Sequence, residues 1–163
     1  MWRAGEPADL PSPEPRLAPT RTWPRAEAEL ATTLRALCAD MPAFPGRFIL
    51  HFQSGRDRLR YVSAWSDGLD LCIEAFNHHA EPGTDPDRLG WTKSGDRWQR
   101  RFDDAVRNSG HADSAATMLV DAIAAMGVDV DDLAYHGTIS GRGCLLHLDL
   151  PDLTLMRIVE PDD

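Results

Sequence analysis

Residues that could bind a metal ion occur at two places in the chain. His78 and His79 are adjacent, and neighbours on an extended chain point to opposite sides, so this pair favours a surface turn over a shared ion. Asp129, Asp131 and Asp132 resemble the start of a calcium-binding loop. The glycine at the sixth position and the glutamate at the twelfth position of such a loop are missing. We therefore expect neither a metal nor a cofactor.

Residues that could catalyse a reaction are present but follow no catalytic motif. The segment HGTISGRG, at 136–143, contains three glycines but lacks the lysine and the following helix of a phosphate-binding loop. A hairpin turn at 140–143 explains the glycines better. Serine, histidine and aspartate all occur, yet no GxSxG motif does. An enzyme would have to use scattered groups such as His51, His136 or His147. The sequence predicts that the chain is not an enzyme.

The cysteines indicate neither a disulfide framework nor a zinc site. Cys38, Cys72 and Cys144 are odd in number and widely spaced, and no CxxC pair occurs. We interpret all three as small buried hydrophobic residues.

Composition narrows the classes of partner. The 163 residues fit one domain, and the net charge of −9 argues against binding to nucleic acid or to an anionic membrane. A basic protein partner fits this charge better. No apolar run approaches the roughly 18 residues that cross a bilayer, and the first residues lack the apolar core of a secretory signal. We expect a cytoplasmic protein.

The elements that must position any site are an arm, two helices and a sheet. Six prolines within residues 1–24 predict a disordered arm, so a single domain is expected over 25–163. Apolar residues at helical spacing predict helices over 24–41 and 112–126, the second ending at Gly127. Segment 127–137 is expected to be a loop ending in a short extended piece. Apolar and polar residues alternate in segment 144–150, which predicts another strand.

The most informative segment is 48–76, which predicts three consecutive antiparallel strands, FILHF, RLRYVSAW and GLDLCIEAF. Asp67-Gly68 between the last two is a strong hairpin signal. We expect one face of this meander to pack on the core through Phe48, Leu50 and Phe52 in the first strand. Leu59, Tyr61 and Trp65 would do so in the second strand, and Leu69, Leu71, Ile73 and Ala75 in the third. The four candidate partner-binding residues are Ile49, Val62, Trp65 and Phe76.

Four motifs, in order, resemble the TY-Chap family, which is related to the YbjN-like and type III secretion chaperone-like domains. The first two are YVSAWSDG and LDLCIEAFNH at 61–78, and the third is RLGW at 88–91. The fourth is Trp98 followed by a helix and the Val-containing loop MGVDVDDLAYHG at 126–137. The resemblance covers about Arg47 to Tyr135, a little over half the chain. It implies a compact α+β fold, a curved antiparallel sheet with two or three helices packed on it. It also implies dimerisation and binding of a client segment.

Together these observations favour a non-enzymatic, chaperone-like module that holds a client protein segment, in a setting that could involve secretion. A homodimer is an open possibility. The alternative is a sensor that binds a small ligand between helix and sheet.

Overall fold

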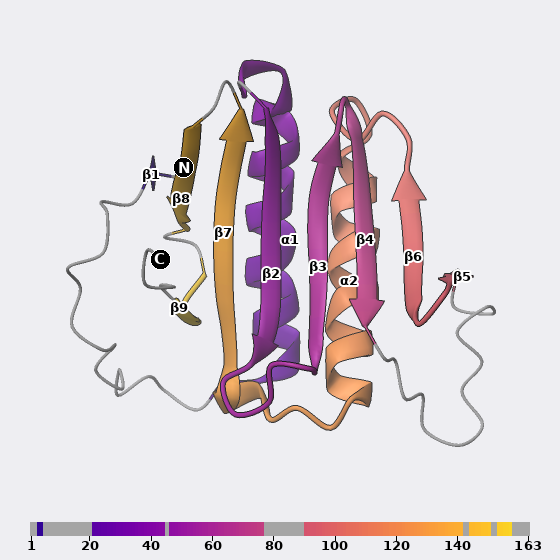
Figure 1. Cartoon of the computed structure of the whole chain (residues 1–163), viewed down its shortest axis with the longest axis vertical. Coiled ribbons are helices and arrows are strands. Elements are labelled where there is room, and N and C mark those ends of the chain that lie inside the picture. The colour runs from indigo at the N-terminus through magenta and orange to yellow at the C-terminus, as the bar shows by residue number, and fades with distance from the viewer. Residues whose placement is uncertain are drawn as a thin grey trace.

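The computed structural model describes residues 3–4, 21–44, 46–76, 90–141, 144–150 and 153–157. Within them, two α-helices lie against one face of a single sheet (Figure 1). The helices are α1 (Trp23–Asp40) and α2 (Ser109–Ala125), with the 3-10 turns η1 (Met41–Ala43) and η3 (Val130–Asp132). The strands are β1 (Arg3–Ala4), β2 (Arg47–Ser54), β3 (Tyr61–Asp67), β4 (Asp70–Phe76), β5 (Thr92–Ser94), β6 (Arg97–Phe102), β7 (Leu133–Gly141), β8 (Cys144–Asp149) and β9 (Met156–Arg157).

The sheet confirms the α+β class. Its order is β1-β8-β7-β2-β3-β4-β6-β5, and the seven strands from β8 to β5 are antiparallel to their neighbours. The short β9 pairs in parallel with β7. The predicted meander is present as β2-β3-β4, and segment 144–150 forms β8 as expected. Strand β7 is longer than expected. A short extended piece was predicted at the end of segment 127–137, but the strand continues to Gly141, into the predicted turn at 140–143.

Helix α1 matches its prediction within a residue at each end. The Thr22 hydroxyl caps it by accepting the Arg25 backbone N–H at 3.3 Å, and Pro24 occupies the first turn, where no N–H is needed. Leu30, Leu34 and other apolar residues at helical spacing are buried against the sheet and α2. The helix starts before residue 25, so the expected boundary between arm and domain falls inside it.

Helix α2 begins at Ser109, three residues before the predicted start at 112. Its buried stripe is rich in alanine, including Ala112, Ala115 and Ala116. Small side chains let the helix axis approach the sheet closely. Gly127 ends the helix with a φ of +79°, a left-handed conformation that glycine adopts without strain.

The inward face of the sheet corrects one prediction. Phe48, Leu50 and Phe52 of β2 are buried in the core, as expected, but β3 contributes Val62 and Ala64. The register pairs Phe52 with Val62 and Leu50 with Ala64, and directly paired residues point to the same face. The assignment of Leu59, Tyr61 and Trp65 to the core side was therefore wrong, and so was that of Leu69, which lies in the β3–β4 turn and is 46 % exposed. Small and β-branched residues of β3 face the helices, and its aromatic residues face away.

The β3–β4 hairpin is confirmed. Asp67 pairs with Asp70 across a two-residue turn, and Gly68 has a φ of +62°. A positive φ at the first central position is the pattern of a type II′ turn, which suits the twist of the flanking strands. A Cβ added at Gly68 would meet no atom within 4 Å, so the backbone conformation alone calls for glycine here.

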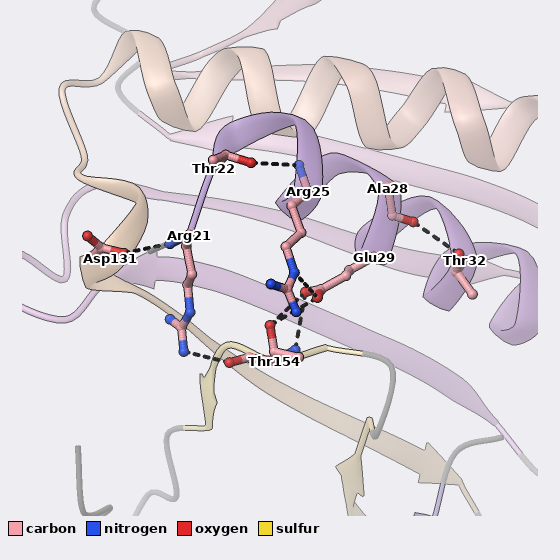
Figure 2. Close-up of polar contacts among 8 residues, drawn as sticks. All are labelled: Arg21, Thr22, Arg25, Ala28, Glu29, Thr32, Asp131 and Thr154. Atoms are coloured by element: carbon pink, nitrogen blue, oxygen red, sulfur yellow. Dashed lines mark hydrogen bonds and ion pairs between the residues drawn. The ribbon is translucent and has the colours of Figure 1, made fainter. Parts of the chain in front are cut away.

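A polar cluster holds the late part of the chain against the start of α1 (Figure 2). The Glu29 carboxylate accepts the Thr154 backbone N–H at 3.2 Å and its hydroxyl at 3.0 Å, and it also accepts Arg25 Nε at 3.2 Å. Arg21 donates from Nη2 to the Thr154 carbonyl at 2.5 Å and from its backbone to Asp131 at 3.3 Å. These contacts explain why the residues on either side of Thr154 are buried in the core: Leu153 and Leu155.

Several predictions lie outside the described residues. These are most of the arm at 1–24, the His78-His79 pair and the residues just before Gly90. Arg3 and Ala4 of that arm form β1, paired with β8.

Candidate partner-binding site

The candidate site is the face of the sheet that points away from α1 and α2, which we call the open face. None of the described helices lies over it (Figure 1). Residues of this face alternate with the core residues along each strand, so strand register determines which side chains meet there. Antiparallel sheets can keep one face accessible in this way.

Three of the four predicted partner-binding residues lie on the open face. Ile49 is 39 % exposed and pairs in register with the half-buried Trp65. Phe76 is also half-buried. The fourth residue, Val62, is 1 % exposed in the core and cannot contact a partner, so its assignment to the outer face was wrong. The error follows from the reversed faces of β3.

A row of polar side chains crosses the open face between the Ile49–Trp65 pair and Phe76. It runs from strand to strand through paired positions. In sheet order from β7 to β6 it contains His136, His51, Ser63, Glu74 and Gln99. His51 Nδ1 lies 2.8 Å from Ser63 Oγ. The Glu74 carboxylate, which is almost fully buried, accepts Gln99 Nε2 at 3.3 Å.

Aromatic rings are packed beside this row. Tyr61 stacks on Phe76 with centroids 5.2 Å apart and rings only 5° from parallel, and His51 lies 4.5 Å from Tyr61 on its other side. Burial raises the pKa of the Tyr61 hydroxyl above its ordinary value, and the positive charge of Arg97 opposes that rise. Arg97 also pairs with Glu74 at 3.4 Å. The open face is thus a mixed surface of aromatic rings and satisfied polar groups.

The end of the face beside the β3–β4 turn is an ion-pair cluster. Arg101 contacts Asp70 at 2.6 Å and Asp67 at 2.9 Å, and Asp70 also accepts the Asp104 backbone N–H at 2.8 Å. The bond from Asp104 and then Arg101 lower the pKa of the Asp70 carboxyl. Burial raises the pKa of the neighbouring Cys72 thiol, with Arg101 opposing it. A protonated thiol is a poor nucleophile, so this end of the face serves structure.

The Ser63–His51 contact has the separation of a nucleophile and its base, but its setting is poor for acyl transfer. Ser63 lies in the middle of β3, which is paired on both sides with β2 and β4. The backbone N–H groups around it are therefore used in two ladders and cannot form an oxyanion hole. Among the described side chains, no group of three or more His, Cys, Asp or Glu residues is arranged to share a metal ion.

The space between helices and sheet was the expected place for a small ligand in the sensor alternative. An apolar cavity of about 10 Å³ lies there, which has space for a single water molecule at most. Its lining includes Leu30, Phe52, Leu119 and Leu133. A metabolite does not fit into this cavity.

The sequence had given no sign of several of these residues. His51 and Ser63 become neighbours only through the β2–β3 register, and the reversed faces of β3 had placed Tyr61 in the core. The sequence signal that could have shown the true core side of β3 is the run Val62-Ser63-Ala64. Its inward residues, Val62 and Ala64, face the helices.

No protein-family model, curated protein or solved structure matches the chain. The resemblance to the TY-Chap family therefore stays a prediction. No described helix is long and apolar enough to cross a membrane.

Proposed function

We propose that the chain is a non-enzymatic, chaperone-like protein-binding module that holds a segment of a client protein against the open face. The observation that carries the proposal is the asymmetry of the sheet. One face is covered by both helices, and the other presents Ile49, Trp65, Tyr61 and Phe76 around a row of polar groups. Trp and Tyr are enriched among residues that dominate binding energies at protein interfaces.

The polar row supports a protein client in particular. An extended peptide or a helix lying across the strands would place apolar side chains on the rings and polar groups over His51 and Gln99. Both of those residues are held in place by neighbours, so little ordering entropy is lost on binding. The net charge of −9 favours a client segment with basic residues. A cytoplasmic location and a link to secretion belong to this proposal.

The sensor alternative finds less support, because the cavity between helices and sheet holds no more than a water molecule. A thermal-shift screen against metabolites addresses it directly. A ligand-dependent rise in Tm would favour the sensor over the client-binding module.

The experiment that tests the proposal is site-specific photocrosslinking in extract of the native cell. A benzoylphenylalanine replaces Ile49 in one variant and Leu59 in the control. Leu59 is 65 % exposed and lies in the β2–β3 connection, outside the open face. We expect the variant at position 49 to be crosslinked to a different protein. We expect the variant at position 59 to give no crosslinked product.

Two outcomes would contradict the proposal. Equal crosslinking from both positions would show that contact is unspecific. Crosslinking from position 49 to a second copy of the chain alone would identify the open face as a dimer interface that leaves no room for a client.

A further inference from the structure

We propose that His136 and His147 together bind a divalent transition-metal ion, such as Zn²⁺ or Ni²⁺, on the open face. The two imidazoles come from the adjacent strands β7 and β8, and both are half-buried. This inference is independent of the client-binding function, and it departs from our expectation that no metal binds.

The distance between the rings is that of a long hydrogen bond, and it is also the distance between two ligands of one ion. His136 Nε2 and His147 Nδ1 are 3.4 Å apart. That exceeds the usual range of about 2.7–3.2 Å for a hydrogen bond with an N–H donor. Two imidazole nitrogens bound at about 2.0–2.1 Å to one tetrahedral ion lie about 3.3–3.4 Å apart. The pair therefore has the spacing of two ligands, with little movement required of either ring.

The surrounding sheet fixes this geometry. His147 pairs in register with Thr138, two residues along β7 from His136, so both histidines point to the open face. A Cβ on Gly137, between His136 and Thr138, would lie 3.1 Å from Leu148 Cβ, so β7 and β8 are closely packed here. Rigid backbones on both sides lower the entropy that the two side chains lose on binding an ion.

The chemistry of the donors selects the ion. Imidazole nitrogen suits Zn²⁺, Ni²⁺ and Cu²⁺, whereas Mg²⁺ and Ca²⁺ prefer oxygen. Binding needs both facing nitrogens as lone pairs, so the ring hydrogens move to His136 Nδ1 and His147 Nε2. Because the described residues hold no three-ligand group, water completes the coordination shell. Such a site binds more weakly than a structural zinc site with four protein ligands.

His51 and Asp149 favour a cation at this position. His51 pairs in register with His136 on the other side of β7, and its Nδ1 is used by Ser63. Asp149 follows His147 by two residues on β8, which places its carboxylate on the same face. The Asp149 carboxylate adds negative potential on this side of the pair, and Arg3 of β1 pairs in register with Asp149.

The test measures Tm of the untagged full chain at about pH 7.5, above the ordinary pKa of histidine. Zn²⁺ and Ni²⁺ are the probes, and Mg²⁺ is the control ion. At about 100 times Kd, we expect Zn²⁺ or Ni²⁺ to raise Tm by about 5 to 10 °C. His136→Ala and His147→Ala should each abolish the rise. The matched controls His111→Ala, on α2, and the double variant His78→Ala/His79→Ala should keep it.

The proposal fails if neither ion raises Tm, or if the rise persists in His147→Ala or disappears in the His78/His79 double variant. Each variant is first checked for a cooperative transition without metal, and His147→Gln replaces any alanine variant that lacks one. A Zn²⁺ titration followed by NMR gives a second readout that does not depend on stability. The imidazole signals of His136 and His147 must shift together, and that of His111 must stay unchanged.

Discussion

Val62 and Ile49 offer a direct test of which side of the sheet faces the core. Val62 is 1 % exposed on β3, whereas Ile49 on β2 is 39 % exposed on the open face. Val62→Ala removes two methyl groups, worth about 1.6 kcal/mol of transfer free energy. It also leaves about 50 Å³ of new space beside the existing apolar cavity, which adds about 1 kcal/mol. We expect a total loss of about 2 to 3 kcal/mol in the free energy of unfolding.

Ile49→Ala is the matched control, because it also shortens an aliphatic side chain on a central strand. Its cost should stay below about 1 kcal/mol, since the side chain is already partly in water. Urea unfolding followed by circular dichroism measures both variants, and an unchanged m-value shows that the comparison is sound. The Tm of Val62→Ala should fall by about 5 to 10 °C.

The reasoning is refuted if the two variants lose equal stability, or if Ile49→Ala loses more. Either result would mean that β3 presents Tyr61 and Trp65 to the helices, as the sequence alone suggested. A one-residue change of register exchanges the two faces of a strand completely, so intermediate behaviour is not expected.

Three further predictions concern single residues. Gly68→Val should lower the free energy of unfolding by about 2 kcal/mol through backbone strain at positive φ, whereas Gly110→Ala, in α2 with no atom within 4 Å of its Cβ, should raise it by about 0.5 kcal/mol; equal effects in urea unfolding would contradict this. The lowered pKa of Asp70 means that the folded state binds its proton less readily. Its contribution to stability is complete above the ordinary pKa of about 3.9 and is lost as the pH falls through the folded value. Asp70→Asn should therefore destabilise the protein at neutral pH and flatten the acid side of its stability curve, and an unchanged acid limb would count against this. Burial raises the pKa of Cys38 to about 12, so iodoacetamide at about pH 8 should modify this thiol, as followed by mass spectrometry, only as fast as the protein opens; rapid modification of the folded protein would show that the thiol is accessible.

Local signals predicted the elements that local physics determines. Helix α1 follows from its apolar spacing and from Pro24, and the β3–β4 hairpin follows from Gly68. Both depend on interactions within a few residues, which sequence patterns report well.

Strand β7 depends on distant contacts instead. The sequence predicted only a short extended piece here, and Gly137 lowers the strand propensity of the segment. In the structure this glycine is required, because a Cβ would lie 3.1 Å from Leu148 Cβ and 3.3 Å from Leu50 Cδ1. Why position 137 requires glycine becomes clear only when its neighbouring strands are known.

Only part of the candidate site could be predicted, because the rest also depends on contacts between distant segments. Ile49 and Phe76 could be assigned to the outer face from strand alternation. Trp65 was a candidate only because Trp is frequent at interfaces, since alternation had placed it on the core side. Their neighbours His51 and Ser63 could not be assigned, because cross-strand pairs depend on register. In β3, large aromatic residues usually indicate a core side, but the residues of β3 that pack in the core are Val62 and Ala64.

The position of β2 has a consequence for how the chain folds. This strand lies between β3, which follows it closely, and β7, which begins only at Leu133. During synthesis β2, β3 and β4 can pair while β7 is still being made, so one edge of β2 stays open and Phe48, Leu50 and Phe52 lack their final neighbours. The centre of the finished sheet is therefore completed late, by closure of a long loop, which slows folding. Until then, the unpaired edge of β2 is where a nascent chain is most exposed to misassociation.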